Sequence, residues 1–130
     1  MSAMSNYLEA AILNHILRNS SFTSPTTVYL GLFTSDPGEA LGSPSGEIVG
    51  FGYARQACAF DAPSSAVSVN SATEQFTASG GNWGSITHWA LFDAAVDGNM
   101  LIYGTFDTPR TVNDGDTFQV AAGDLAITAA

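Results

Sequence analysis

The sequence predicts a mainly β domain, either an antiparallel two-sheet sandwich or a small jelly roll or barrel, with one N-terminal α-helix. About eight short apolar segments are separated by turn residues at fairly regular spacing, which is typical of sandwiches and barrels. Only residues 6–19 show a helical pattern. No period of about 20 to 50 residues recurs, so a repeat array is excluded. The 130 residues are enough for one domain, 1–130, with its own core.

The N-terminal part predicts an arm and a helix. Residues 1–5 are expected to form a loose arm. Asn6 can cap a helix, with Glu9 three residues later as its capping-box partner, and apolar side chains then recur every four residues, which predicts a helix over 6–19. The resulting stripe either packs under a sheet or docks on a neighbouring subunit, and the pattern leaves both open. It consists of Leu8, Ile12 and Ile16, widened by Leu13 and Leu17.

A β-sandwich is predicted over 27–130, and its first strand is 27–34. The segment 38–52 is rich in Gly, Ser, Pro and Glu, and we expect a long loop that contacts a partner, forms a lid or is mobile. Apolar character then resumes in strands. These are predicted at 53–60, 66–70, 73–78, 117–120 and 125–128.

The centre of the fold is predicted to be a hairpin of strands 86–92 and 100–106, joined by Asp97-Gly98-Asn99. Gly adopts positive φ without steric cost, so Asp-Gly is a strong hairpin signal. Alternation places Ile86, His88, Ala90 and Phe92 on one face, and Thr87, Trp89 and Leu91 on the other. Both faces are mostly apolar, so both are expected to be covered.

The charge balance excludes some partners. The chain has 12 carboxylates against Arg18, Arg55 and Arg110, and its net charge is −9. Such a surface repels phosphate, so we expect no direct contact with nucleic acid. There is no basic leader and no apolar run of about 20 residues, so we expect a protein made in a cytoplasm and not bound to membrane.

No catalytic motif is present, and we expect a non-enzymatic protein without a cofactor or metal. Gly-x-Ser-x-Gly and a phosphate-binding glycine loop are absent. Cys58 is expected to be a buried thiol, while His15 and His88 are expected to be a helix-boundary residue and a core or interface residue. Asp114 and Asp116 fit turn chemistry better than a calcium loop, because the closing Glu is missing.

Two residues have competing interpretations. Trp83 is a candidate interface residue or a sugar-stacking platform, whereas Trp89 is expected in a core or an interface. Arg55 is a candidate interface anchor, because a guanidinium can pair with a partner's carboxylate. An intrachain salt bridge explains Arg55 equally well.

Four segments, in order, resemble a family of small tailed-bacteriophage virion proteins, of the kind described as tail-fibre-like or capsid-decorating. Together they span 27–128. The segments are 29–37 (YLGLFTSDP), 52–57 (GYARQA), 83–94 (WGSITHWALFDA) and 113–117 (NDGDT), the last before a terminal Ala-Gly-x-Leu strand.

The resemblance implies a non-enzymatic, multimeric structural protein of the virion with an all-β body. The sequence lacks a shaft repeat and a coiled coil, which favours a capsid cement or decoration protein that bridges major capsid subunits at the capsid surface. By analogy with such proteins we expect a homotrimer. The alternative is a tail fibre, or a receptor-binding or carbohydrate-binding component of the tail.

Overall fold

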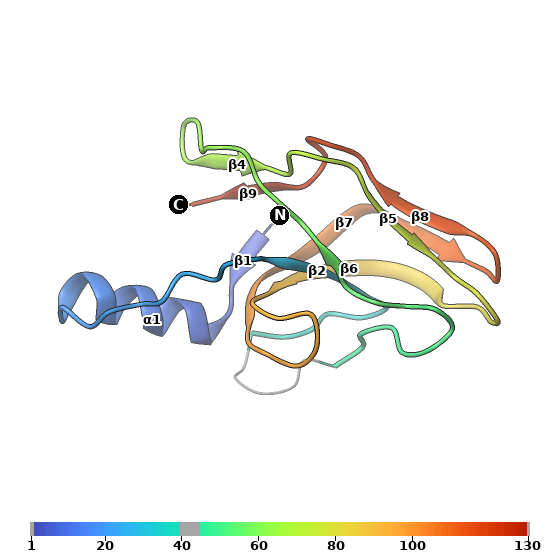
Figure 1. Cartoon of the computed structure of the whole chain (residues 1–130), viewed down its shortest axis with the longest axis horizontal. Helices are drawn as coiled ribbons and strands as arrows, with labels where there is room; N and C mark the ends of the chain where they lie inside the picture. The colour runs from blue at the N-terminus through green and yellow to red at the C-terminus, as the bar shows by residue number, and fades with distance from the viewer. Residues whose placement is uncertain (1, 40–44, 130) are drawn as a thin grey trace.

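A computed structural model describes residues 2–39 and 45–129 and shows two β layers with a helix at their edge (Figure 1). One layer is a five-stranded sheet in the order β1-β7-β6-β2-β3, and the other consists of the ribbons β4-β9 and β5-β8. The elements are β1 (Ser2–Met4), α1 (Asn6–Leu17), β2 (Tyr29–Phe33), β3 (Gln56–Ala57), β4 (Val67–Val69), β5 (Glu74–Thr77), β6 (Gly84–Phe92), β7 (Met100–Val112), β8 (Thr117–Val120) and β9 (Ala126–Thr128).

The predicted fold class is confirmed in its sandwich form. Every strand pairing within the described residues is antiparallel, and the sheets do not close into a barrel. The predicted hairpin is central, because β6 pairs with β2 on one side and with β7 on the other. Helix α1 extends beyond the edge of the sheets, as Figure 1 shows.

The main core lies between the two layers. It combines side chains of the five-stranded sheet with side chains of the β5-β8 ribbon, so sandwich packing excludes water from both. Cys58 is buried in this core, as expected from its apolar neighbours. Burial, together with the nearby Glu74 carboxylate, raises the pKa of the Cys58 thiol to about 12. The residues that form the core include Leu30, Leu32, Phe76, Trp89, Leu91, Phe118 and Val120.

The predicted alternation along β6 is wrong at Ile86. Ile86 lies in the main core with Trp89 and Leu91, whereas Ala90 and Phe92 lie in a second cluster on the opposite face of the sheet. The pairing of β6 with β7 is interrupted at this point by a β-bulge or similar irregularity, since Ile86 pairs with Arg110 but His88 already pairs with Thr105. The extra residues in β7 include Pro109, which has no N–H to donate and is tolerated at such a bulge.

The predicted loose arm is wrong for residues 2–4. They form β1, which pairs with β7 through Ser2–Gly104, Ala3–Tyr103 and Met4–Ile102 and becomes an edge strand of the main sheet. A segment of three residues is too short to show an alternation of apolar and polar side chains, so its sequence does not predict a strand. The pairing depends on the available edge of the long strand β7.

The helix is shorter than predicted, and its cap lies one residue earlier. Ser5, not Asn6, is the N-cap, and its hydroxyl accepts from Leu8 N at 3.2 Å and donates to the Met100 carbonyl oxygen at 2.5 Å. The helix ends at Leu17 rather than at 19, because Asn19 adopts positive φ, a conformation that stops a helix.

The predicted loop 38–52 and strand 53–60 differ from the structure. Residues 40–44 lie outside the described residues. The described half at 45–52 is fixed against the edge of β2, because Thr34 N donates to the Gly46 carbonyl and Ile48 N donates to the Leu32 carbonyl. The strand is reduced to β3, which pairs with β2 only at Tyr29 and Leu30.

Candidate functional site: a loop pair locked by Arg55

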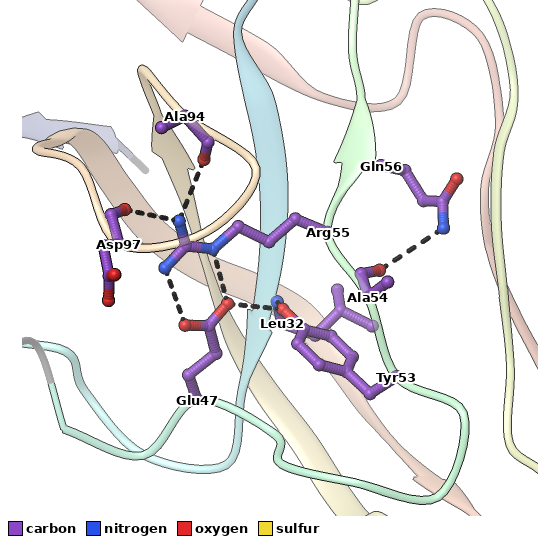
Figure 2. A network of polar contacts seen from close by, with 8 residues as sticks. All are labelled: Leu32, Glu47, Tyr53, Ala54, Arg55, Gln56, Ala94 and Asp97. Carbon is purple, nitrogen blue, oxygen red and sulfur yellow. Dashed lines mark hydrogen bonds and ion pairs between the residues drawn. The ribbon is translucent and has the colours of Figure 1, made fainter.

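Arg55 joins two loops, 45–52 and 93–99, which we call the loop pair (Figure 2). Its Nε donates to Glu47 Oε2 at 2.8 Å, and its Nη2 donates to Glu47 Oε1 at 2.9 Å. Nη1 donates to the carbonyl oxygens of Ala94 at 3.0 Å and Asp97 at 2.8 Å. The Arg55 side chain is 8% exposed, so the guanidinium acts as an internal clamp.

The ion pair lies on the outer face of the five-stranded sheet, away from the sandwich core. The guanidinium carbon of Arg55 is 3.5 Å from the centroid of the Phe92 ring, an arrangement that adds cation–π attraction. Gly31 of β2 makes room for the carboxylate, because a Cβ at this position would lie 2.8 Å from Glu47 Oε2. The small residue in β2 therefore sets how closely Glu47 approaches the sheet.

Tyr53 connects the ion pair to the edge of β2. Its hydroxyl donates to Glu47 Oε2 at 2.6 Å and accepts from Leu32 N at 3.0 Å. Beyond the short β3, this contact and the Ile48 N–H satisfy the backbone of Leu32 at the sheet edge. Burial, with the Glu47 carboxylate as a second cause, raises the pKa of Tyr53 well above its ordinary value and keeps the donor protonated.

The loop 93–99 also has its own internal order. Asp97 and Gly98 both adopt positive φ, as the hairpin signal predicted. Asp93 Oδ1 accepts from Asn99 N at 2.7 Å, and Asp93 Oδ2 accepts from Asn99 Nδ2 at 3.0 Å. Arg55 therefore grips a loop that is already folded locally.

The charged and phenolic groups that join the loop pair are engaged with one another. Both Glu47 oxygens accept hydrogen bonds, and Arg55 and Tyr53 direct their donors inward. Two aliphatic side chains of the loops are exposed beside polar ones such as Asp97 and Asn99: Val49 is 85% exposed and Val96 is 77% exposed. Fixed backbones with exposed aliphatic side chains form a preorganised contact surface.

The structure does not bring the five predicted interface residues together. Leu8 of α1 is buried, whereas Ile12 and Ile16 of the same helix are exposed. Arg55 makes the intrachain salt bridge that was its alternative interpretation. Trp83 lies in the core, 7% exposed, so the predicted sugar-stacking platform at Trp83 is not present in this fold.

Trp83 is buried because two neighbours cover it. Its indole Nε1 donates to the Phe51 carbonyl oxygen at 3.1 Å, and Tyr53 meets its ring edge-on with 5.6 Å between centroids. A hollow of about 200 Å³ beside the loop 45–52 has Trp83 in its wall, but the ring contributes little surface to it.

The other candidate residues of the sequence have local roles. Asp116 Oδ2 accepts from Asn113 N, which confirms turn chemistry at Asp116, whereas Asp114 Oδ1 accepts from the distant Gly80 N. His15 contacts the Ser20 carbonyl oxygen, and His88 contacts the Thr87 hydroxyl. In the described part of the chain, no cluster of three or more His, Cys, Asp or Glu side chains could hold a metal ion. No described helix is long and apolar enough to span a membrane.

The sequence did not reveal Glu47 as the partner of Arg55, or the roles of Tyr53 and Gly31 around Glu47. One signal was present, because Tyr53 and Arg55 are two residues apart in an extended segment and so project to the same side. Glu47 gave no such signal, since its position depends on how the Gly-rich loop turns back along β2.

Comparison with known proteins identifies a family for this mainly β chain. The sequence model of a family described as podophage GP4 fiber I protein gp80 matches residues 3–128. No curated protein matches significantly. The family match includes all four segments that resemble tailed-phage virion proteins. The chain belongs to the podophage GP4 fiber I protein gp80 family, and thus to the structural proteins of phage virions.

Proposed function

We propose that this chain is a non-enzymatic, fibre-type component of a podophage particle that acts by attachment. The family description supports the fibre assignment. The structural observation that carries the proposal is α1, where Leu13, Ile16 and Leu17 are each more than half exposed on a helix that extends from the sandwich. We expect another chain to cover this exposed apolar face of α1.

The charge supports attachment to protein rather than to nucleic acid or membrane. With a net charge of −9, the surface repels the phosphates of packaged DNA and of anionic lipids. The partners we propose are further copies of this chain and other virion proteins, with a homotrimer as the expected assembly. A structural role also fits the loop pair, because Glu47, Tyr53 and Arg55 are engaged with one another.

A capsid cement or decoration protein is the second candidate. It is favoured by the described residues forming a short sandwich without an elongated shaft. A cement protein would bind between major capsid subunits at the capsid surface, whereas a fibre component would attach at the tail.

Quantitative mass spectrometry of purified particles, empty heads and detached tails tests the proposal. A fibre component is expected in complete particles and detached tails, in few copies per particle. Recovery in heads, in a fixed ratio to the major capsid protein, would support cement instead. Absence from all three fractions would exclude a virion role of either kind. A hydrolase activity that tracks with the purified chain would contradict the non-enzymatic assignment.

A further inference from the structure

Part of the apolar surface of helix α1 is not covered by the rest of the chain. Of its large aliphatic residues only Leu8 is buried, while Ile12, Leu13, Ile16 and Leu17 are 37%, 57%, 70% and 74% exposed. A helix of 12 residues is marginal in water and depends on packing for most of its stability. The exposed residues are therefore suited to a second contact.

A groove lies directly beside this helix, between α1 with β1 and the β4-β9 ribbon. It consists of a hollow of about 600 Å³ and an adjoining hollow of about 240 Å³, which share Leu8, Ser68, Ile102 and Ile127. Glu9 is the only charged side chain among the described residues that line it. The remaining lining is mostly apolar and includes Met4, Ile12, Val28, Phe60, Pro63 and Ala66.

We propose that α1 of one copy of this chain docks into the groove of a second copy, which deepens the proposed function by naming its first partner and surface. The exposed helix face consists of four aliphatic side chains and is too small to form a stable interface alone. A stable interface needs roughly 800 Å² from each partner. Exchange between copies meets this need, because each chain then contributes both a helix and a groove.

The distribution of charge favours the same occupant. Residues 2–26 contain only Glu9 and Arg18, so this segment has no net charge. The other eleven carboxylates and two arginines lie outside it. Two copies of such an acidic protein repel each other over most of their surface, and the helix with its groove is where they approach at the lowest electrostatic cost.

Helix-to-groove contacts between copies can form a closed assembly in two ways. A reciprocal pair has two-fold symmetry, whereas helix-to-groove contacts that continue in one direction close into a ring of three or more. In both arrangements every helix and every groove is covered, and the trimer expected for this protein corresponds to the ring.

Light scattering with size-exclusion chromatography tests the proposal on the full chain. The native chain is expected to be an oligomer at micromolar concentration, and Ile16→Asp is expected to reduce it to a monomer with an unchanged circular dichroism spectrum. Val49→Asp is the matched control, because it places the same charge at another exposed aliphatic residue, on the loop pair. It should leave the mass of the oligomer unchanged.

A cysteine pair tests the contact itself. Ile16→Cys with Ala66→Cys should form a disulfide between chains under mild oxidation, because Ala66 lines the groove and Ile16 lies on the exposed helix face. A covalent dimer indicates the two-fold pair, and a covalent trimer indicates the ring. Buried Cys58 stays out of this reaction while the chain is folded.

Three results would overturn the proposal. The first two are a native chain that is monomeric at tens of micromolar and an Ile16→Asp variant with the native mass. The third is an Ile16→Cys variant whose introduced thiol becomes protected from thiol reagents only when another virion protein is added, which would assign the helix to a different partner. None of these three results bears on the proposed virion role. That role would be contradicted separately, by purified particles that lack the chain.

Discussion

The guanidinium of Arg55 uses four of its five N–H donors within the chain, two on Glu47 and two on backbone carbonyls of the loop 93–99. Because it is one of three cations in the chain, its use as an internal clamp indicates that loop geometry depends on it. A lysine could not reproduce the contact, since its single ammonium lacks the planar fork that meets both carboxylate oxygens.

Replacing Arg55 with Met should destabilise the fold by about 2–4 kcal/mol, because Glu47 is then left largely buried without its partner. Denaturant unfolding measures the loss. Arg110→Met is the control, as Arg110 is exposed, and it should change stability by less than about 0.5 kcal/mol. Equal effects of the two substitutions would show that the ion pair contributes nothing beyond general charge.

Gly31→Ala tests the close approach of Glu47 to β2. The new Cβ would lie 2.8 Å from Glu47 Oε2 and 3.1 Å from the Tyr53 hydroxyl, so we expect a loss of about 1–3 kcal/mol from overpacking. The same substitution in a Glu47→Ala background should cost less, because the nearest obstructing atom is gone. Additive effects in unfolding experiments would mean that Gly31 and Glu47 do not constrain each other.

At the scale of elements, the sequence predicted best where local signals were strong. The bounds of β8 and the turn at Asp97-Gly98 agree with the structure, because alternation and positive φ are local properties. The bulge at Ile86 and the pairing of β1 depend on a partner strand distant in sequence, so no local pattern encodes them. Glu47 was missed for the same reason, because its contact with Arg55 depends on how the loop 45–52 lies along β2, which no local pattern encodes.

The start of α1 provides a test of which residue, Ser5 or Asn6, is the N-cap. Ser5→Ala should cost about 1–2 kcal/mol, because it removes the acceptor for Leu8 N and the buried hydrogen bond to Met100. Asn6→Ala should cost much less, since Asn6 is exposed and lies inside the helix. Thermal unfolding of both variants measures the two stability losses. A larger loss for Asn6→Ala than for Ser5→Ala would mean that Asn6 is the N-cap, as the sequence suggested.

For the molecule as a whole, burial of ionisable groups predicts alkaline instability. The folded-state pKa of Cys58 is raised from 9.0 to about 12, and that of Tyr53 is also raised. An acid with a raised pKa contributes stability that is fully present below its unfolded pKa and is lost as pH rises toward the folded value. The free energy of unfolding should therefore decline between about pH 9 and pH 12.

Denaturant titrations from pH 7 to pH 11 measure this decline, and Cys58→Ala is the informative variant. It removes one of the two groups, so its stability should fall less steeply with pH than that of the native chain, whatever its stability at pH 7. Parallel curves for the two proteins would show that the thiol ionises as easily in the folded state as in the unfolded one.

We propose that this chain is a structural component of a phage particle and that its helix is covered by another copy. Cryo-electron microscopy of the intact particle tests it most directly. We expect density for the sandwich on the particle, with α1 bound in the groove beside Ile102 and Ile127 of an adjacent copy. Density in which every copy of α1 points into solvent, or a particle without the sandwich, would contradict it.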